Sequence, residues 1–416
     1  MFMIKRDSVM PSASSPLTAE APSSDDSVSL PVQSALRSFF KRFWLRMHLY
    51  LGLFGGALFV LMSLTGSFLV FYKAIDEWLH PTQLTTIGTG TIRPLNEIVA
   101  VAQAAGPPRG WLDNIEFPSH DRDVFHAWHK APGVRLDQFR WYQVTIDPYS
   151  GTVLGRDREW GDSLVSVVYM LHVSLLLDDL GETIVGFVAI ALLLSIGTGV
   201  YLWWPSLSRI RRAFTCTSRG SVIRRYYEWH KLSGFYSATV LGMLAFTGMY
   251  LEFSEYVVPV VRLFSPVQEF SEEEVLSSLP MSGARPLSVE QAVARASQIF
   301  PEGELRSISL PQSNGGVYQF IFRQPGEVRR SSGQSEVWLD QYSGAVIKVR
   351  DWRTFTAGDT FVAWLFPLHN GEAFGLIGRW IVFPCGFVPL ILYVTALRMW
   401  WLKRAAHRRQ NQRAGT

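Results

Sequence analysis

The stretch HLYLGLFGGALFVLMSLTG, residues 48–66, decides the fold of this chain. It contains no Asp, Glu, Lys or Arg, and it lies in an apolar run from Trp44 to Tyr72 that is long enough to cross a bilayer core of ~30 Å. The stretch HKLSGFYSATVLGMLAFTG, residues 230–248, repeats its histidine, its glycine four residues later and its closing Thr-Gly pair. The constant offset of 182 residues predicts a duplicated membrane protein.

Two further apolar runs, Thr183–Trp204 and Trp380–Leu402, make four spans together with Trp229–Phe253. The composition agrees, because 48% of the 416 residues are hydrophobic and only 18% are charged. We therefore expect a disordered cytoplasmic tail (1–40), transmembrane helix 1 (41–75), a first periplasmic domain (76–162), an interfacial segment with transmembrane helix 2 (163–205), a basic cytoplasmic loop (206–225), transmembrane helix 3 (226–255), a second periplasmic domain (256–356), an interfacial segment with transmembrane helix 4 (357–403) and a basic cytoplasmic tail (404–416).

Basic residues at the span ends predict the orientation. They precede span one, occupy the short link between spans two and three, and follow span four, so four spans place them all on one side. That side is cytoplasmic by the positive-inside rule, which puts both termini in the cytoplasm. These residues are Arg37, Lys41, Arg42, Arg46, Arg209, Arg211, Arg212, Arg219, Arg224, Arg225, Lys403, Arg404, Arg408, Arg409 and Arg413.

A second repeated pattern relates spans two and four. His172 and His369 are separated by 197 residues, the same offset that relates the Trp-Trp pairs closing these spans. The hairpin-turn sequence DPYSG at 147–151 likewise returns as DQYSG at 340–344, with a glycine available for positive φ. The predicted fold class is an α-helical membrane protein with α+β extracytoplasmic domains. Its four transmembrane helices form two parallel repeats about an axis along the membrane normal.

Each polar stretch has the pattern of an α+β domain. Helical periodicity covers Leu95–Ala105 and Leu287–Phe300, and Ser288 with Gln291 forms a capping-box pattern. The strands that we expect lie at 115–117, 124–128 and 141–146 in the first stretch and at 307–310, 317–322 and 337–339 in the second.

One histidine marks each span: His48, His172, His230 and His369. An ionisable residue at membrane depth is a functional hypothesis by default, and imidazole is a common axial ligand of haem iron. The repeat predicts one pair near the cytoplasmic face, His48 with His230, and one near the outer face, His172 with His369. Two facing imidazoles would hold a haem with no open coordination site. The alternatives are zinc, for which no further ligand repeats nearby, and ordinary interfacial histidines.

Glycines recur on the histidine face of spans one and three. Gly52 and Gly234 follow their histidines by four residues, and Gly66 and Gly248 follow by 18, which is five helical turns. Small residues there leave room for a flat macrocycle, or they only allow close helix contact.

Two charges occupy equivalent positions at the outer ends of spans two and four. Arg379 is predicted to hold a haem propionate or to pair with Glu182, and ordinary anchoring is the alternative. The remaining histidines of the first polar stretch are interpreted as surface residues: His80, His120, His126 and His129.

Several functional classes are excluded by composition. Two cysteines, Cys216 and Cys385, exclude a disulfide scaffold and the usual iron–sulfur cluster, and no Cys-x-x-Cys-His motif attaches a haem covalently. The net charge of +4 indicates no nucleic-acid partner. Without a dinucleotide or P-loop motif, any reducing equivalents come from a partner or from a quinol.

Through these motifs the chain resembles the PepSY-associated transmembrane family of iron-regulated membrane proteins, over almost all of residues 40–403. It is similar to the inner-membrane ferric-siderophore reductases of that family. The resemblance implies PepSY-like domains at 76–162 and 256–356 and two b-type haems. It also carries the haem histidines over onto His48, His172, His230 and His369.

That resemblance implies a reductase in the bacterial inner membrane. Electrons from a cytoplasmic donor or a quinol would reduce a periplasmic ferric siderophore, and Fe(II) would leave because hard oxygen ligands hold it less tightly. Three alternatives stay open: a PepSY binding or regulatory protein without redox activity, an electron-transfer subunit for another periplasmic reductase, and a siderophore or metal permease. The lipid bilayer is a partner in all of them.

Overall fold

The computed structural model describes residues 29–133, 139–205, 214–215, 220–268, 276–279 and 285–414. Four helical segments in it are long and apolar enough to cross a membrane, as the sequence predicted. They are Ser38–Val70, helix α7 (Asp178–Trp203), helix α9 (Val222–Glu252) and Glu372–Ala414. Much of the predicted basic loop at 206–225 lies outside the described residues.

Span one changes its helical pitch along its length. Helix α1 (Ser29–Tyr50) passes into a π-helical turn, η1 (Leu51–Gly55), and α2 (Gly56–Val70) completes the span. The start of α1 corrects the predicted disordered tail at 1–40, because the last part of that segment is helical. Pro31 lies in the first turn of α1, where its missing N–H breaks no helical hydrogen bond.

Span four is divided into α13 (Gly375–Cys385) and α14 (Val388–Ala414). Gly386 lies at the break, where an added Cβ would be 1.9 Å from the hydroxyl of Ser67 on α2. Glycine is therefore required for this close approach. Helix α14 continues to Ala414, so the predicted basic tail at 404–416 is helical over most of its length.

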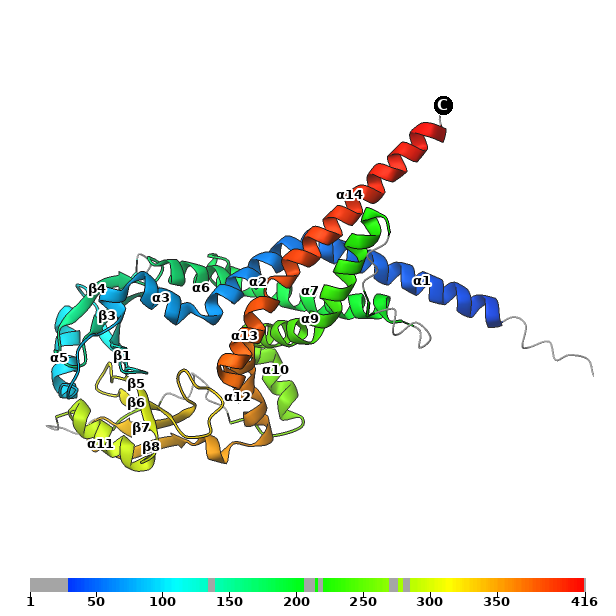
Figure 1. Cartoon of the computed structure of the whole chain (residues 1–416). Coiled ribbons are helices and arrows are strands. Elements are labelled where there is room, and N and C mark those ends of the chain that lie inside the picture. Colours follow the sequence, from blue (N-terminus) through cyan, green and yellow to red (C-terminus); the bar gives the residue numbers. More distant parts are fainter. Residues whose placement is uncertain are drawn as a thin grey trace, which may run out of the picture. The chain divides into compact units, whose positions relative to one another are not determined.

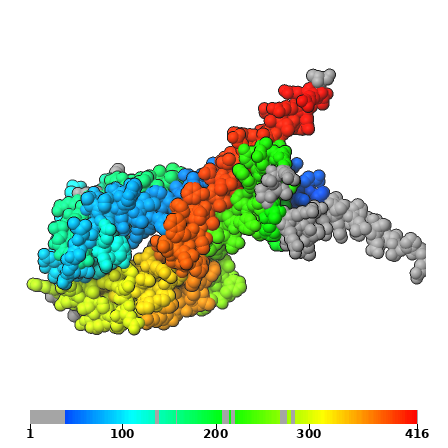
Figure 2. All heavy atoms as spheres, in the orientation of Figure 1, coloured from blue at the N-terminus to red at the C-terminus, as the bar shows by residue number. Residues whose placement is uncertain are grey.

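The two polar stretches, which the sequence predicted as separate domains, form one eight-stranded antiparallel sheet (Figure 1). The strand order is β4-β3-β2-β1-β5-β6-β7-β8, and β1 pairs with β5 at the centre. Segments of the two halves, cyan and yellow in Figure 2, lie against each other. The strands are β1 (Trp111–Glu116), β2 (Phe125–Pro132), β3 (Phe139–Ile146), β4 (Val153–Glu159), β5 (Glu304–Ser309), β6 (Val317–Arg323), β7 (Ser335–Asp340) and β8 (Val346–Arg350).

A hydrophobic core lies between one face of this sheet and helices α5 (Leu95–Ala105) and α11 (Val289–Ile299). Ile115 of β1 and Ile308 of β5 face each other across the join and are both 0% exposed, so the core continues from one half into the other. The predicted helix at Leu95–Ala105 and the capping box of Ser288 are confirmed.

Each half contributes four strands, one more than the sequence predicted. The unpredicted strands, β4 and β8, lie at the two edges of the sheet, and β8 has an exposed, charged sequence without apolar alternation. The predicted hairpin turns precede both strands. Gly151 and Gly344 adopt positive φ there, at 71° and 67°.

Separate helices connect the sheet to the spans, as predicted for the interfacial segments. Helix α3 (Tyr72–Leu79) follows span one, α6 (Leu164–Ser174) follows β4, and α12 (Ala357–His369) follows β8 (Figure 1). Both histidine-bearing helices, α6 and α12, turn tightly into the next span. An added Cβ would lie 1.5 Å from the Ser174 carbonyl oxygen at Gly181, and 2.2 Å from the Gly371 oxygen at Gly378.

Candidate functional site

The four span histidines meet in the two predicted pairs. His48 of α1 faces His230 of α9, with ring centroids 6.2 Å apart, and we call these two residues the far pair. His172 of α6 faces His369 of α12, also at 6.2 Å, and we call them the sheet-side pair because both helices follow the sheet in the chain. The ring planes are inclined at 84° in the far pair and 43° in the sheet-side pair.

Both separations suit one metal ion between two axial imidazoles. A metal–nitrogen bond of about 2.0 Å and roughly 1.2 Å from that nitrogen to the ring centre place two opposed rings about 6.3 Å apart. The observed separation is 6.2 Å in each pair.

The far pair is held through its Nδ1 atoms. Nδ1 of His48 lies 3.1 Å from the Ser195 carbonyl oxygen and 3.2 Å from the Thr198 hydroxyl. Nδ1 of His230 lies 3.1 Å from the Leu392 carbonyl oxygen and 3.1 Å from the Thr395 hydroxyl. Because a carbonyl oxygen can only accept, each Nδ1 carries the proton.

The sheet-side pair has the same arrangement. Nδ1 of His172 lies 2.9 Å from the Thr65 hydroxyl, and Nδ1 of His369 lies 2.9 Å from the Thr247 hydroxyl and 3.2 Å from the Leu244 carbonyl oxygen. Thr65 donates its own hydroxyl hydrogen along its helix, to Leu61 at 2.8 Å, so it accepts from the imidazole.

All four imidazoles are thereby set in one tautomer. With the proton on Nδ1, the lone pair of Nε2 is left for a metal, and the partner of Nδ1 orients the ring. Sequence reasoning missed the threonines in this role, although the repeat offsets relate them in two pairs. They are the buried residues Thr65, Thr198, Thr247 and Thr395.

Two of the predicted glycines lie against the imidazoles of the sheet-side pair. An added Cβ would lie 3.0 Å from Cε1 of His172 at Gly66 and 3.2 Å from Cε1 of His369 at Gly248. These glycines let the imidazole of a neighbouring helix approach the backbone of spans one and three. Space for a macrocycle at both residues stays a prediction.

The other two predicted glycines are more open. An added Cβ would meet nothing within 4 Å at Gly52 and would make only an ordinary contact, 3.4 Å from Leu392, at Gly234. Room for a flat group beside the far pair therefore stays a prediction for these positions.

Arg379 contacts a different acid from the one proposed. Its guanidinium lies 3.8 Å from Glu372, so the ion pair found here replaces the predicted alternative of pairing with Glu182. Glu372 is fully buried and accepts hydrogen bonds from the backbone N–H and hydroxyl of Ser331, at 3.0 and 3.1 Å. The segment after His369 is thereby tied to the β6–β7 loop.

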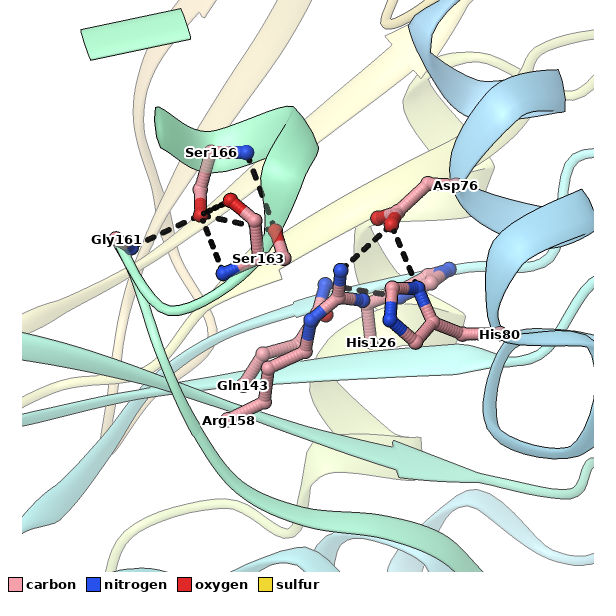
Figure 3. Close-up of polar contacts among 8 residues, drawn as sticks. All are labelled: Asp76, His80, His126, Gln143, Arg158, Gly161, Ser163 and Ser166. Atoms are coloured by element: carbon pink, nitrogen blue, oxygen red, sulfur yellow. Dashed lines mark hydrogen bonds and ion pairs between the residues drawn. The ribbon is translucent and has the colours of Figure 1, made fainter. Parts of the chain in front are cut away.

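Two groups of polar contacts lie where the first half of the sheet meets its helices (Figure 3). Ser163 and Ser166 form a capping box at the start of α6, and the N–H of Gly161 donates to the Ser166 hydroxyl at 3.0 Å. Asp76 of α3 accepts from Arg158 of β4 at 2.6 Å. The first group fixes the start of the helix that carries His172, and the second ties α3 to the edge strand of the sheet.

The histidines of the first polar stretch are not all surface residues. His129 is 1% exposed, with Nε2 3.1 Å from the Ala102 oxygen, and half-buried His126 lies 3.2 Å from Asp123. Burial alone raises the pKa of Asp123, but hydrogen bonds from His126 and Ser119 outweigh it and hold the pKa below its usual range. This corrects the surface interpretation for these two histidines.

The span pairs and the one converging metal-type group differ in their ligand sets. Among the described residues, the one group of three or more His, Cys, Asp or Glu side chains with converging ligand atoms is Glu77, His120 and Asp123. Neither span pair has such a third ligand. Two imidazoles without further donors suit a haem, whose macrocycle supplies the remaining ligands, better than tetrahedral zinc.

The family model for the PepSY-associated TM region matches residues 45–403. The chain belongs to this family. The match covers all four histidines of this PepSY-associated protein, together with the sheet. No curated protein matches the chain.

Proposed function

We propose that this PepSY-associated protein carries electrons across the bacterial inner membrane and reduces a ferric siderophore on the periplasmic side. The observation that carries the proposal is the pair of matched histidine sites, each with centroids 6.2 Å apart and each with Nδ1 held by the protein. Two b-type haems, one in each pair, fit these residues. The far pair would receive electrons and the sheet-side pair would deliver them.

We further infer that the chain consists of two parallel repeats, each a span, half of the sheet and a second span. The constant offsets support this inference, as do the equivalent histidine–threonine contacts in both halves. The basic residues at the far ends of the spans support an orientation with both termini in the cytoplasm.

In this mechanism the protein's own residues bind the cofactor and orient the histidines that hold it. His48 and His230 would hold one haem iron through Nε2, and His172 and His369 would hold the other. The four threonines keep each Nδ1 protonated, so each ring presents a lone pair in a set direction. When bound, haem would supply a one-electron carrier. Apolar helices around the pairs keep water away from this path.

In the substrate step, one electron passes to each siderophore-bound iron. Fe(III) in the siderophore becomes Fe(II), and the chelator's hard oxygen ligands then hold the metal less tightly. No bond in the chelator needs to break. The donor on the other side is a quinol or a reduced cytoplasmic partner, because the sequence has no nucleotide-binding motif.

Absorption spectra of the detergent-purified protein, oxidised and dithionite-reduced, test the proposal with haem quantified per chain. We expect sharp reduced α-bands and about two b-type haems. Protein from haem-replete cells that contains no haem would contradict the reductase and favour a binding or regulatory role. Proteoliposomes with an internal reductant and an external ferric siderophore then test electron transfer, read as Fe(II) outside.

A further inference from the structure

One arginine beside the sheet-side pair has no anionic partner. Arg329 lies in the β6–β7 loop, and its guanidinium lies over the ring of Phe366, 4.6 Å from the centroid. Its Nε is buried without a hydrogen-bond partner, and within the described part of the chain the guanidinium makes no hydrogen bond or ion pair. Burial lowers the pKa of Arg329, as expected for a cation without a direct counter-charge.

The acids nearest to Arg329 are engaged elsewhere. Glu372 accepts two hydrogen bonds from Ser331 and faces Arg379. Glu336 accepts hydrogen bonds from Gln319 at 2.8 Å and from Arg350 of β8 at 3.2 Å. Both carboxylates attract the charge of Arg329 from a distance, without a hydrogen bond or ion pair to it. A guanidinium in this setting is suited to an anion that the protein itself does not supply.

Arg329 and Arg379 both contact the segment that carries His369. Phe366, beneath Arg329, lies three residues before His369 and therefore on the same side of α12. On the other side of His369, an added Cβ at Gly371 would lie 3.0 Å from Cα of Arg379. The Arg329 guanidinium thus lies beside α12 one turn before His369, and the backbone of Arg379 lies beside Gly371, two residues after His369.

We propose that Arg329 and Arg379 form a carboxylate-binding site beside the sheet-side histidine pair. A planar guanidinium can donate two parallel hydrogen bonds to one carboxylate, and burial strengthens them. The carboxylate comes from one of two sources. It is a propionate of haem held by His172 and His369, a source that rests on the proposed function, or it belongs to an anionic iron chelate that reaches this position.

The stability of variants separates a binding role from a structural one. A half-buried cation without a counter-charge costs stability, so haem-free Arg329→Gln is expected to unfold at the same temperature as the haem-free wild type or higher. The neighbouring, exposed Arg330 provides the matched control, Arg330→Gln, and Arg329→Lys retains the charge without the planar fork.

The experiment uses the full chain in lipid nanodiscs. We measure the rate of haem release to a haem-scavenging protein, and we titrate citrate and ferric citrate calorimetrically. If the site holds a propionate, Arg329→Gln releases one of the two haems about tenfold faster while Arg330→Gln does not. If it holds a chelate, haem release is unchanged and ferric citrate binds about tenfold more weakly.

Unchanged haem release and unchanged binding of both citrate forms in Arg329→Gln would overturn the proposal. Failure of the proposed function has a different signature, because the wild type would then carry no haem. In that case, citrate binding to the haem-free protein tests by itself whether the carboxylate site exists. Binding that is lost in Arg329→Gln supports the site, and absent or equal binding refutes it.

Discussion

The two halves of the chain agree where they hold the histidines and differ where they meet the sheet. In each half the imidazoles bond through Nδ1 to a threonine of a neighbouring helix. At the sheet side, the first half has an Asp76–Arg158 ion pair, whereas the second half has Arg329 and the Arg379–Glu372 pair. The shared contacts orient the histidines. The charged residues near the sheet differ, so the two halves can bind different groups there.

The two halves also differ in the backbone of the junctions that follow helices α6 and α12 and lead into the next span. After α6, three non-glycine residues adopt positive φ: Leu175 at 52°, Leu176 at 61° and Asp178 at 51°. After α12, the positive φ angles belong to Gly371 and Gly375. A left-handed non-glycine residue costs about 1 kcal/mol. The first junction is therefore strained where the second is relaxed.

The largest expected effect tests the equivalence of the halves at the histidines. His230→Ala and His369→Ala are each expected to remove one of two haems, because one imidazole is lost from each pair. Electron transfer across the membrane should fall at least ~100-fold in either variant. The first-half variants His48→Ala and His172→Ala should match them. A full haem content in any of the four, measured per chain, contradicts the assigned pairing.

Alanine at the tight junctions is expected to be destabilising in both halves. Gly181→Ala places a methyl group 1.5 Å from a carbonyl oxygen, and Gly378→Ala places it 2.2 Å away. We expect a loss of about 3 kcal/mol, larger at Gly181. Thermal unfolding in detergent measures it. Gly242→Ala is the control, because its Cβ would meet nothing within 4 Å, and equal melting temperatures for all three variants would disprove the packing argument.

Acid stability is expected to distinguish the halves. Hydrogen bonds from His126 and Ser119 depress the pKa of Asp123, so its contribution is complete above the ordinary Asp value near 4 and is lost as pH falls through the folded pKa. Burial raises the pKa of Glu327 in the second half, so stability there decreases as pH rises above the ordinary Glu value. Asp123→Asn should cost about 2 kcal/mol at pH 7 and somewhat less at pH 3, where only part of the contribution is lost because the folded pKa lies lower still. Melting curves that differ equally at both pH values would reject this assignment.

Removing one threonine hydroxyl should weaken its own site alone. Thr65→Val leaves Nδ1 of His172 without its 2.9 Å partner and should speed haem loss from the sheet-side pair about tenfold. Thr198→Val should speed haem loss from the far pair less, because the Ser195 carbonyl oxygen, 3.1 Å from Nδ1 of His48, still accepts its hydrogen bond. Thr65→Ser should behave like the wild type. Haem-release kinetics with a scavenger protein give the comparison. Equal release from Thr65→Val and Thr65→Ser would exclude the positioning role.

The smallest effect concerns the strained junction. Asp178→Gly removes a left-handed non-glycine residue and should stabilise the protein by about 1 kcal/mol. The reverse change in the second half, Gly375→Asp, should destabilise it by at least as much, because Gly375 has φ 61° and ψ −141°. Melting temperatures that move in the same direction for both variants would contradict the difference between the junctions.

The amino-acid sequence by itself determined the four spans, the hairpin turns and the partners within each histidine pair. These features depend on local patterns: apolar runs of sufficient length, glycines after a turn, and histidines at constant offsets. Hydropathy and spacing along one chain are sufficient to predict them.

Only the tertiary structure decided how distant segments meet. The pairing of β1 with β5 joins the two expected domains in one sheet, and the sequences of these strands do not predict that they pair. The contacts of Thr65 with His172 and of Arg329 with Phe366 likewise join residues from separate elements. Such contacts depend on which helix and strand faces pack together. Sequence periodicity predicts that a face is buried, but the packing of the whole chain selects what lies against it.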